Sequence, residues 1–435
     1  MMPLHRLKTA LNTPWQRTLY IMFFAQLLTA VGFSSIFPFL PLYIHELGSS
    51  TGTSLELLSG LVYSGQAFTM MLTAPLWGAL ADRYGRKLMV ERAMFGGTVI
   101  LLLMAFCRSA EDLVILRAIQ GLITGTVAAA NALVAAMAPR EHSGYAMGLL
   151  QVGQGAGVAL GPMVGGVIAD SYGYSAAFYV TSLLLLLGGL LVLFGVKEPF
   201  DPRAKAKGRP SVLGGWREIL ASPGVPVNYS LGFLSSLARN MLLPILPLFI
   251  PLVLASTQSV NTFTGLVVGV SSGTTTLSSI YFGRLGDRIG HRKVLVTSLI
   301  AGGLLYIPQI WVNAAWQILI LQAVIGVALG GVIPSYSALL ARYTRPGLEG
   351  AVYGLDNAIG SGARALAPML GSAVAVWLGL RPAFAITAVV LVLAGLAGSA
   401  LLPQREMPPA PASERTALKP ARTPGEPTAL HQRAR

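Results

Sequence analysis

Four charged side chains interrupt the long apolar segments of this sequence. Arg117 lies in LRAIQG, Arg239 lies in SSLARNMLL, and Asp356 and Arg364 share the segment AVYGLDNAIGSGAR. A charge inside an apolar segment is costly and marks a candidate functional site. Burial raises the pKa of a carboxyl group and a nearby arginine lowers it, so two opposite effects act on Asp356. We predict a proton-coupling site at Asp356 that Arg239 or Arg364 tunes; the alternative is a fixed ion pair that holds helices together.

Arg117 belongs to a polar stripe of its own segment. Thr124 and Asn131 follow it at intervals of seven residues, so the three side chains share a helical face that could border a central cavity. The alternative is that Arg117 lies close enough to the outer surface to extend its charge into water. The other acids near apolar segments sit at predicted helix ends and are interpreted as solvated charges: Glu56, Glu91, Asp170 and Glu349.

Two related polar segments separate apolar ones. GALADRYGRK begins at Gly78, and GRLGDRIGHRK begins at Gly283, 205 residues later. Gly78 permits a close approach to a neighbouring helix, and Gly85 permits a tight reversal of the chain. Asp82 and Arg86 can then pair across the turn. The other members of this predicted gate are Arg83, Lys87, Asp287 and Arg288.

Composition assigns the chain to the polytopic membrane proteins. Of its 435 residues, 54% are hydrophobic and 11% are charged, and the mean hydropathy is +0.64. The net charge of +14 reflects topology rather than nucleic-acid binding, because only Arg108 and Arg381 fall in predicted outward loops. The single cysteine, Cys107, excludes an intramolecular disulfide, and no cleavable signal peptide is expected.

Twelve apolar segments are each long enough to cross a hydrocarbon layer of ~30 Å as a helix. An even number of spans places both termini on one side of the membrane, and the distribution of Lys and Arg indicates that this side is the cytoplasm. The predicted spans cover approximately 16–44, 56–79, 89–107, 112–137, 143–169, 175–196, 225–252, 262–284, 294–312, 316–342, 349–377 and 382–402.

The spans form two halves. We predict a cytoplasmic arm at 1–14, a six-helix bundle at 15–196, a cytoplasmic linker at 197–224 and a second six-helix bundle at 225–402. The tail at 403–435 has too few apolar residues to form a core and is expected to be disordered. The halves repeat one another, since FPFLPLYI, ILRAIQG and LGPMVGG return as LPILPLFI, ILQAVIG and LAPMLGS at separations of 205 or 206 residues. Parallel repeats of this kind bring a site to the midplane between them and permit alternating access.

These motifs resemble those of the major facilitator superfamily, and the chain is most similar to its twelve-helix bacterial drug:proton antiporters over about 14–402. The resemblance implies an all-α fold of two six-helix repeats, a gate at the GALADRYGRK loop that braces the facing half, and a role for Arg117 in proton transfer. It also favours antiport over symport, because helix five carries the antiporter pattern. The residues of that predicted pivot are Gly153, Gly157, Gly161, Pro162, Gly165 and Gly166.

The substrate site is expected to be an apolar and aromatic cavity with few polar groups. The first span lacks the acid that such exporters often carry, which puts a preference for cationic drugs in doubt, and Arg239 and Arg364 admit neutral or anionic substrates. Ordinary packing between helices is the alternative role for each candidate. The candidate lining residues are Gln26, Phe33, Phe37, Tyr63, Gln66, Asn131, Gln154, Tyr336 and Asn357.

The functional prediction is proton-coupled efflux of small lipophilic compounds across the bacterial inner membrane, by a chain expected to act as a monomer. The main alternative is a major facilitator with another cargo, such as a sugar, an organic anion or a glycolipid. A membrane enzyme or sensor is disfavoured because the sequence offers no paired carboxylates, metal-ligand cluster or nucleophile constellation. The sequence has no phosphate-binding loop of the G-x-x-x-x-G-K-[ST] type, so direct ATP drive is not expected. No cofactor and no metal are expected.

Overall fold

The computed structural model describes residues 14–139, 142–198, 224–254, 259–344 and 349–403, and these residues form helices and turns without strands. Most of the predicted arm, linker and tail lies outside the described residues. The first half contains α2 (Pro14–Ile36), η1 (Phe37–Phe39), α3 (Leu40–Leu47), α4 (Leu55–Tyr84), α5 (Arg86–Met104), α6 (Ala110–Ile123), α7 (Thr126–Met137), α8 (Ser143–Tyr172) and α9 (Tyr174–Gly195).

The second half follows the same plan. It contains α11 (Val225–Met241), α12 (Ile245–Phe249), η3 (Ile250–Leu252), α13 (Val260–Ile289), α14 (His291–Tyr306), η5 (Ile307–Trp311), α15 (Ala315–Leu329), α16 (Val332–Tyr343), α17 (Glu349–Leu378) and α18 (Leu380–Leu401). Each predicted span therefore corresponds to one continuous helix or to consecutive helical pieces.

Proline and glycine break the interrupted spans. Pro38 lies in the short η1 segment between α2 and α3, and Pro244 directly precedes α12 at the related place in the second half. A proline ring removes one backbone hydrogen bond and bends the helix. The fourth span is divided at Gly125, whose φ of 129° is unfavourable for residues with a side chain.

Among the described residues, nine spans are long and apolar enough to cross a membrane by length and composition. The three other predicted spans correspond to α4, α5 and α13. They are more polar, since α5 begins with Arg86 and Lys87 and α13 contains the run SSGTTTLSS. Both α4 and α13 pack against the other half, where polar residues are shielded from lipid.

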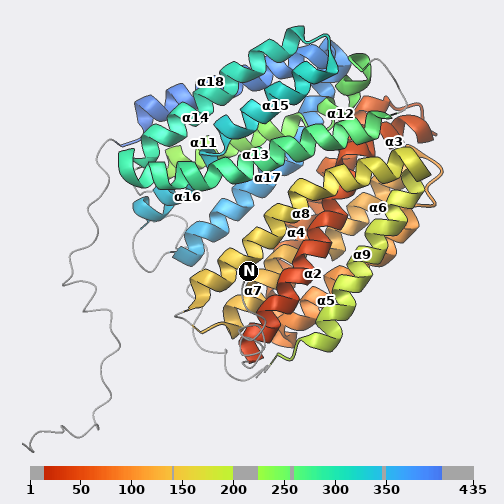
Figure 1. Cartoon of the computed structure of the whole chain (residues 1–435), viewed down its shortest axis with the longest axis vertical. Helices are drawn as coiled ribbons and strands as arrows, with labels where there is room; N and C mark the ends of the chain where they lie inside the picture. The colour runs from red at the N-terminus through yellow and green to blue at the C-terminus, as the bar shows by residue number, and fades with distance from the viewer. Residues whose placement is uncertain (1–13, 140–141, 199–223, 255–258, 345–348, 404–435) are drawn as a thin grey trace, which may run out of the picture.

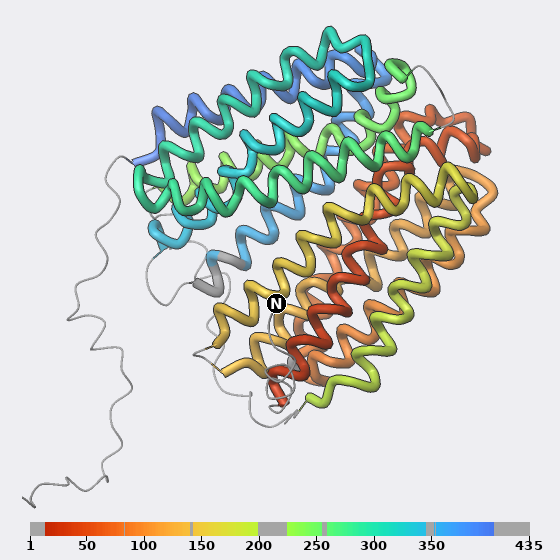
Figure 2. The backbone as a smooth tube through the Cα atoms, viewed as in Figure 1, coloured from red at the N-terminus to blue at the C-terminus, as the bar shows by residue number. Residues whose placement is uncertain are grey.

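The two halves form separate bundles that meet at one end (Figures 1 and 2). We call the end with the Gly85 and Gly290 turns the motif end, and the end with the Gly173 and Gly379 turns the opposite end. The bundles touch near the opposite end, where α8 packs on α13 and α4 packs on α17. A Cβ added to Gly60 of α4 would lie only 2.8 Å from the carbonyl oxygen of Pro368 in α17.

At the motif end the bundles diverge. A Cβ added to Gly78 in α4, Gly148 in α8 or Gly354 in α17 would meet no heavy atom of another described residue within 4 Å. The expected close approach of a helix to Gly78 is therefore wrong for this conformation, because no facing helix reaches it. Among the described residues, Gly283 likewise has only Pro334 within 4 Å of an added Cβ, at 3.7 Å.

The turn at Gly85, which has a counterpart at Gly290, can be tested by substitution. Gly85 and its counterpart Gly290 have φ values of 98° and 97°, which favour glycine. Gly85→Ala should lower the free energy of unfolding by about 1 kcal/mol or more, because alanine is strained there. Thermal unfolding of the detergent-purified protein checks this. The control Gly78→Ala lies in a helix with free space around it and should not lower the melting temperature. Equal losses in both variants would contradict the interpretation of the turn.

Candidate functional site

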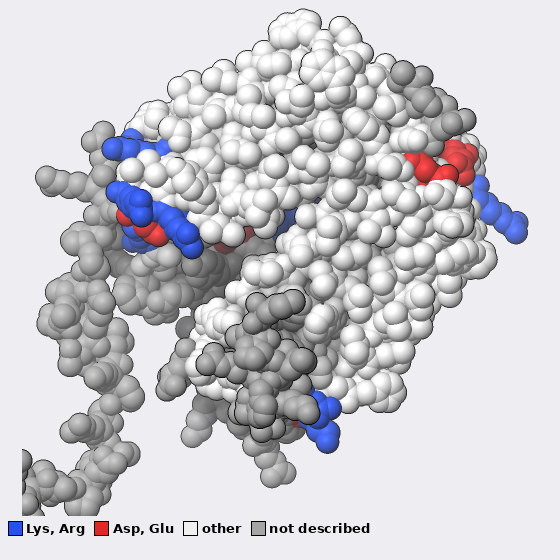
Figure 3. Space-filling view, in the orientation of Figure 1, with Lys and Arg blue, Asp and Glu red and all other residues white. Residues whose placement is uncertain are grey.

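A cavity of about 190 Å³ lies between the two bundles. The first bundle contributes Phe37 and Pro38 to its wall, and the second bundle contributes the rest. Figure 3 shows the surface hollowed between the bundles, with a few charged atoms inside the hollow. The polar residues of the cavity wall are Arg239, Ser271, Ser272, Thr275, Tyr306 and Gln322, and no acidic residue is among the lining residues described.

Arg239 is the charged group of this wall. It is half-buried, and its Nε donates a hydrogen bond to the carbonyl oxygen of Ser235, 3.3 Å away on the same helix. In the described part of the chain its terminal nitrogens have no hydrogen-bond or ion-pair partner. The expected partnership of Arg239 with Asp356 is not present in this conformation.

Arg117 lies in the first bundle behind Phe37. Its side chain is fully buried, so the alternative that it extends into outer water is wrong. Its Nη1 donates to Gln120 Oε1 at 2.8 Å, and its guanidinium carbon lies 5.3 Å from the centre of the Phe37 ring. Tyr63 stacks on the same ring, at 5.7 Å between centroids, and its hydroxyl donates to the Phe37 carbonyl oxygen. Within the described residues, Nε and Nη2 of Arg117 have no hydrogen-bond partner.

Asp356 lies on α17 and is half-exposed. Its Oδ1 accepts a hydrogen bond from the hydroxyl of Tyr336 on α16. Nearby, Tyr229 of α11 donates to the carbonyl oxygen of Val352 at 2.9 Å. Arg364 is exposed and donates to Ser361 Oγ at 3.0 Å, and no described basic residue forms an ion pair with Asp356. The charge of Arg364, on the same helix, nevertheless acts on Asp356, so both the coupling role and the fixed ion pair stay predictions.

The other predicted substrate residues are dispersed. Of the nine candidates, only Phe37 lines the cavity. Gln26 is buried without a partner for its Oε1 among the described residues, and Phe33 packs in the core of the first bundle. Gln66, Asn131 and Gln154 are half-buried, and Asn357 is exposed. Sequence reasoning missed Tyr306 and Gln322, because a tyrosine and a glutamine inside apolar spans resemble ordinary packing residues.

The glycines of α8 face two different helices. Gly153, Gly157, Gly161 and Gly165 pack on α2; a Cβ at Gly161 would lie 2.6 Å from the carbonyl oxygen of Val31. Ser34 Oγ also donates to the Gly157 carbonyl oxygen at 2.9 Å. In contrast, Gly166 packs on Asn261 of α13, and the Pro162 carbonyl oxygen packs on Gly265 of the same helix. The four glycines that face α2 therefore join α8 to its own bundle, while Pro162 and Gly166 beside them contact the second bundle.

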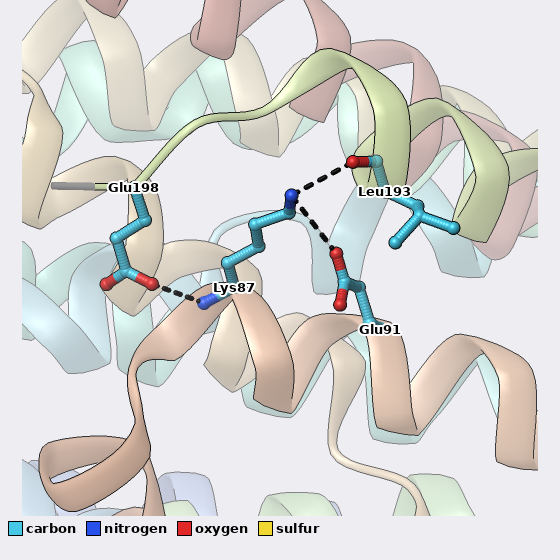
Figure 4. A network of polar contacts seen from close by, with 4 residues as sticks. All are labelled: Lys87, Glu91, Leu193 and Glu198. Carbon is cyan, nitrogen blue, oxygen red and sulfur yellow. Dashed lines mark hydrogen bonds and ion pairs between the residues drawn. The ribbon is translucent and has the colours of Figure 1, made fainter. Parts of the chain in front are cut away.

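The predicted gate loop is held within its own bundle (Figure 4). The carboxylate of Glu198 accepts hydrogen bonds from the backbone N–H groups of Arg86 at 3.2 Å and Lys87 at 2.8 Å. Lys87 Nζ donates to the Leu193 carbonyl oxygen at 2.9 Å and pairs with Glu91 at 3.4 Å. The interpretation of Glu91 as a solvated charge is therefore wrong, because its carboxylate pairs with Lys87 in this network. Sequence reasoning assigned Glu198 to the linker and missed its role at the start of α5.

The side chain of Asp82 lies outside the description, so its pairing with Arg86 stays a prediction. Arg83 is exposed, with its guanidinium 5.3 Å from the centre of the Tyr84 ring. In the second copy, Asp287 near the end of α13 lies 3.1 Å from the ring nitrogen of His291 at the start of α14, across the Gly290 turn, and Arg288 is exposed.

Asp170 joins the two bundles at the opposite end. Its carboxylate accepts hydrogen bonds from the backbone N–H groups of Asn261 at 3.2 Å and Thr262 at 2.6 Å, and from Asn261 Nδ2 at 2.8 Å. A carboxylate at a helix N-terminus satisfies free N–H groups and is favoured by the helix dipole. The interpretation of Asp170 as a solvated helix-end charge is therefore wrong, because the acid of one bundle caps α13 of the other.

The fold and this geometry define a polytopic membrane protein of two repeated bundles around a central cavity. The Major Facilitator Superfamily model matches residues 22–232 and 228–432, and the chain belongs to that family of transporters. The predicted all-α fold class of a major facilitator and the family resemblance are confirmed, and the described helices are consistent with the twelve predicted spans.

Relatives and solved structures agree with this assignment. The chain is 35% identical to the multidrug resistance protein MdtG of Enterobacter lignolyticus over 381 residues, which cover 87% of this chain and 90% of that protein. It is 34% identical to MdtG of Escherichia coli strain UMN026 over 403 residues, or 91% and 98% of the two chains. Among solved structures, a bacterial homologue of the human lysosomal transporter Spinster has a TM-score of 0.75 at 14% identity, covering 90% of this chain and 97% of that one. The nucleoside transporter NupG has a TM-score of 0.73 at 15% identity, covering 89% and 100%.

Removal of the Asp170 carboxylate should open the opposite end. Asp170→Ala leaves the N–H groups of Asn261 and Thr262 without their charged acceptor, and a hydrogen bond to a charge contributes about 1.5–3 kcal/mol. The population with the opposite end open should rise by about tenfold or more. Double electron–electron resonance between labels at the exposed Tyr172 and Leu252, with Cys107 replaced by serine, measures this population.

Glu56→Ala is the matched control, because Glu56 is an acid near the same end for which no contact is described. Its distance distribution should equal that of the labelled parent. Indistinguishable distributions for Asp170→Ala and the parent would show that the carboxylate does not hold the bundles together.

Proposed function

We propose that this chain is a proton-coupled exporter of small lipophilic compounds that works by alternating access in the bacterial inner membrane. The observation that carries the proposal is the asymmetry of the two ends, since the bundles touch at the opposite end and separate at the motif end. A transporter built from two repeats needs two such states, each closed at a different end. The excess of Lys and Arg at the motif end supports a cytoplasmic location, so this conformation is inward-open.

The proposed class of cargo is supported first by the relatives of this chain. Those of 34–35% identity bear the name multidrug resistance protein, which supports export of drug-like compounds. The cavity supports the same class, because leucine, valine and isoleucine side chains surround a few polar groups there. A sugar site would need many more polar partners than this wall offers.

We assign proton coupling to Asp356. In the inward-open state its half-exposed carboxyl can exchange a proton with water from the motif end, and the Tyr336 hydroxyl stabilises the carboxylate by donating to it. Tyr336 comes from α16 and Asp356 from α17, so relative motion of these helices would change the hydrogen bond and with it the proton affinity. Arg117, buried without an acidic partner among the described residues, would sense the same cycle in the first bundle.

The glycine-rich helix α8 supplies the pivot. Its stripe of glycines keeps it against α2, while its contacts with α13 have to separate when the opposite end opens. The gate loop would then close the motif end, with Gly78 and Asp82 meeting the second bundle. This assignment explains why Gly78 has free space around it in the inward-open state.

The coupling residue can be tested in everted membrane vesicles. Asp356→Asn should abolish the stimulation of drug uptake by an imposed pH gradient, because an amide cannot exchange the coupled proton. Exchange of bound drug for external drug, which needs no net proton movement, should continue and would show that the variant is folded. The control Glu56→Gln should keep full stimulation. Uptake that still responds to the gradient in Asp356→Asn would remove Asp356 from the coupling role.

A susceptibility panel in an efflux-deficient host tests the class of function. The intact chain should raise resistance to several lipophilic compounds by a margin that Asp356→Asn loses. Unchanged susceptibility to every compound, with the protein present in the membrane, would favour a cargo other than drugs.

A further inference from the structure

We propose that the cavity beside Arg239 binds organic anions, in which a carboxylate is joined to an apolar body of about the size of two fused rings. This inference rests on the proposed export function and names the substrate class of the same site. Its basis is the combination of an uncompensated guanidinium, convergent neutral donors and an apolar wall.

Charge is the first observation. Arg239 lines the cavity, and no acidic residue is among the described lining residues. Burying a guanidinium without a counter-charge is costly, so such a group inside a membrane bundle calls for a partner. The planar guanidinium presents paired N–H groups that match the two oxygens of a carboxylate.

Arg239 also lacks the contacts of a structural residue. A guanidinium that fastened two helices together would bond across them, but the hydrogen bond of Arg239 goes to Ser235, four residues earlier on α11. Its terminal nitrogens have no bonding partner within the described part of the chain. They remain free to bind a ligand in the cavity.

Neutral donors surround the same space. Ser271 Oγ donates to Gln322 Oε1 at 3.3 Å, which leaves the NH₂ group of Gln322 as its remaining polar end. That NH₂ donates to Gln309 Oε1 at 3.4 Å and has a second hydrogen to offer. Tyr306 contributes a hydroxyl for which no hydrogen bond is described. Donors therefore outnumber charged acceptors, as an anion site requires.

A second cationic side chain, Arg117, lies behind the apolar wall of the cavity. Phe37 closes the cavity on the side of the first bundle, and the buried Arg117 lies 5.3 Å from the centre of that ring. Arg117 is fully buried and would not touch a ligand, but its charge adds to that of Arg239 across a low-dielectric wall. A cationic ligand would be repelled from both sides, and an anionic one attracted.

Equilibrium binding to the purified protein in nanodiscs tests the charge preference directly. The probes are 2-naphthoate, 2-naphthamide and (2-naphthyl)trimethylammonium, which share one apolar body and differ in charge. The wild-type protein should bind the carboxylate more tightly than the trimethylammonium compound by about tenfold or more. Equal or tighter binding of the cation would overturn the proposal.

Variants of Arg239 test whether this residue causes the preference for the carboxylate probe. Arg239→Gln should bind carboxylate and carboxamide with equal affinity, while unchanged binding of the carboxamide shows an intact cavity. Arg239→Lys should keep part of the preference, because it retains the charge and loses the paired donors. Arg17→Gln removes an exposed arginine outside the cavity and should change nothing. A full preference for the carboxylate in Arg239→Gln would refute the assignment of Arg239.

Transport assays distinguish a failure of the anion-site proposal from a failure of the proposed export function. Proton-driven uptake of the trimethylammonium compound without uptake of the carboxylate would overturn the anion site and leave export standing. The expected binding order without driven uptake of any probe would support the anion site and contradict proton-coupled export.

Discussion

The structure depends on close contact of helix backbones where the two bundles meet. Gly166 and Gly265 remove the side chains that would keep α8 and α13 apart, and Asp170 places a carboxylate on the N-terminus of α13. Lipid offers no hydrophobic drive for such an association, so packing and hydrogen bonds have to supply it. These contacts lie at one end only, and the hollow between the bundles follows from that restriction.

The two halves share their turns and helix breaks but not their charged side chains. Both halves reverse their chains at paired glycines, Gly85 with Gly290 and Gly173 with Gly379, and both break their first span near a proline. The charged groups do not follow the repeat, because Arg117 belongs to the first half and Asp356 to the second. The helices and turns therefore follow the repeat, and the charged side chains inside the spans differ between the two halves.

Sequence could predict those features that depend on neighbouring residues along the chain. Nine of the predicted spans follow from the length and apolarity of their segments, and the turn at Gly85 follows from the conformational freedom of glycine. Contacts between distant helices could not be predicted in the same way. Asp170 and Glu198 each bind a helix N-terminus that lies about one hundred residues away in the chain, and nothing beside them in the sequence indicates it.

The same distinction, between local features and contacts with distant helices, applies to the candidate site. The sequence indicated that Arg239 and Asp356 are unusual, because charges are rare inside apolar spans. It could not show that Asp356 binds a tyrosine while Arg239 faces a cavity, since helical periodicity fixes the face of a residue and not the partner on the next helix. Eight of nine candidate lining residues lie elsewhere for the same reason.

The position of Phe37 has a consequence for communication between the halves. Its ring is both a wall of the cavity and the surface on which Arg117 rests, and it sits at the proline-containing break of the first span. A molecule that pushed this ring aside would alter the surroundings of a charge it never touches.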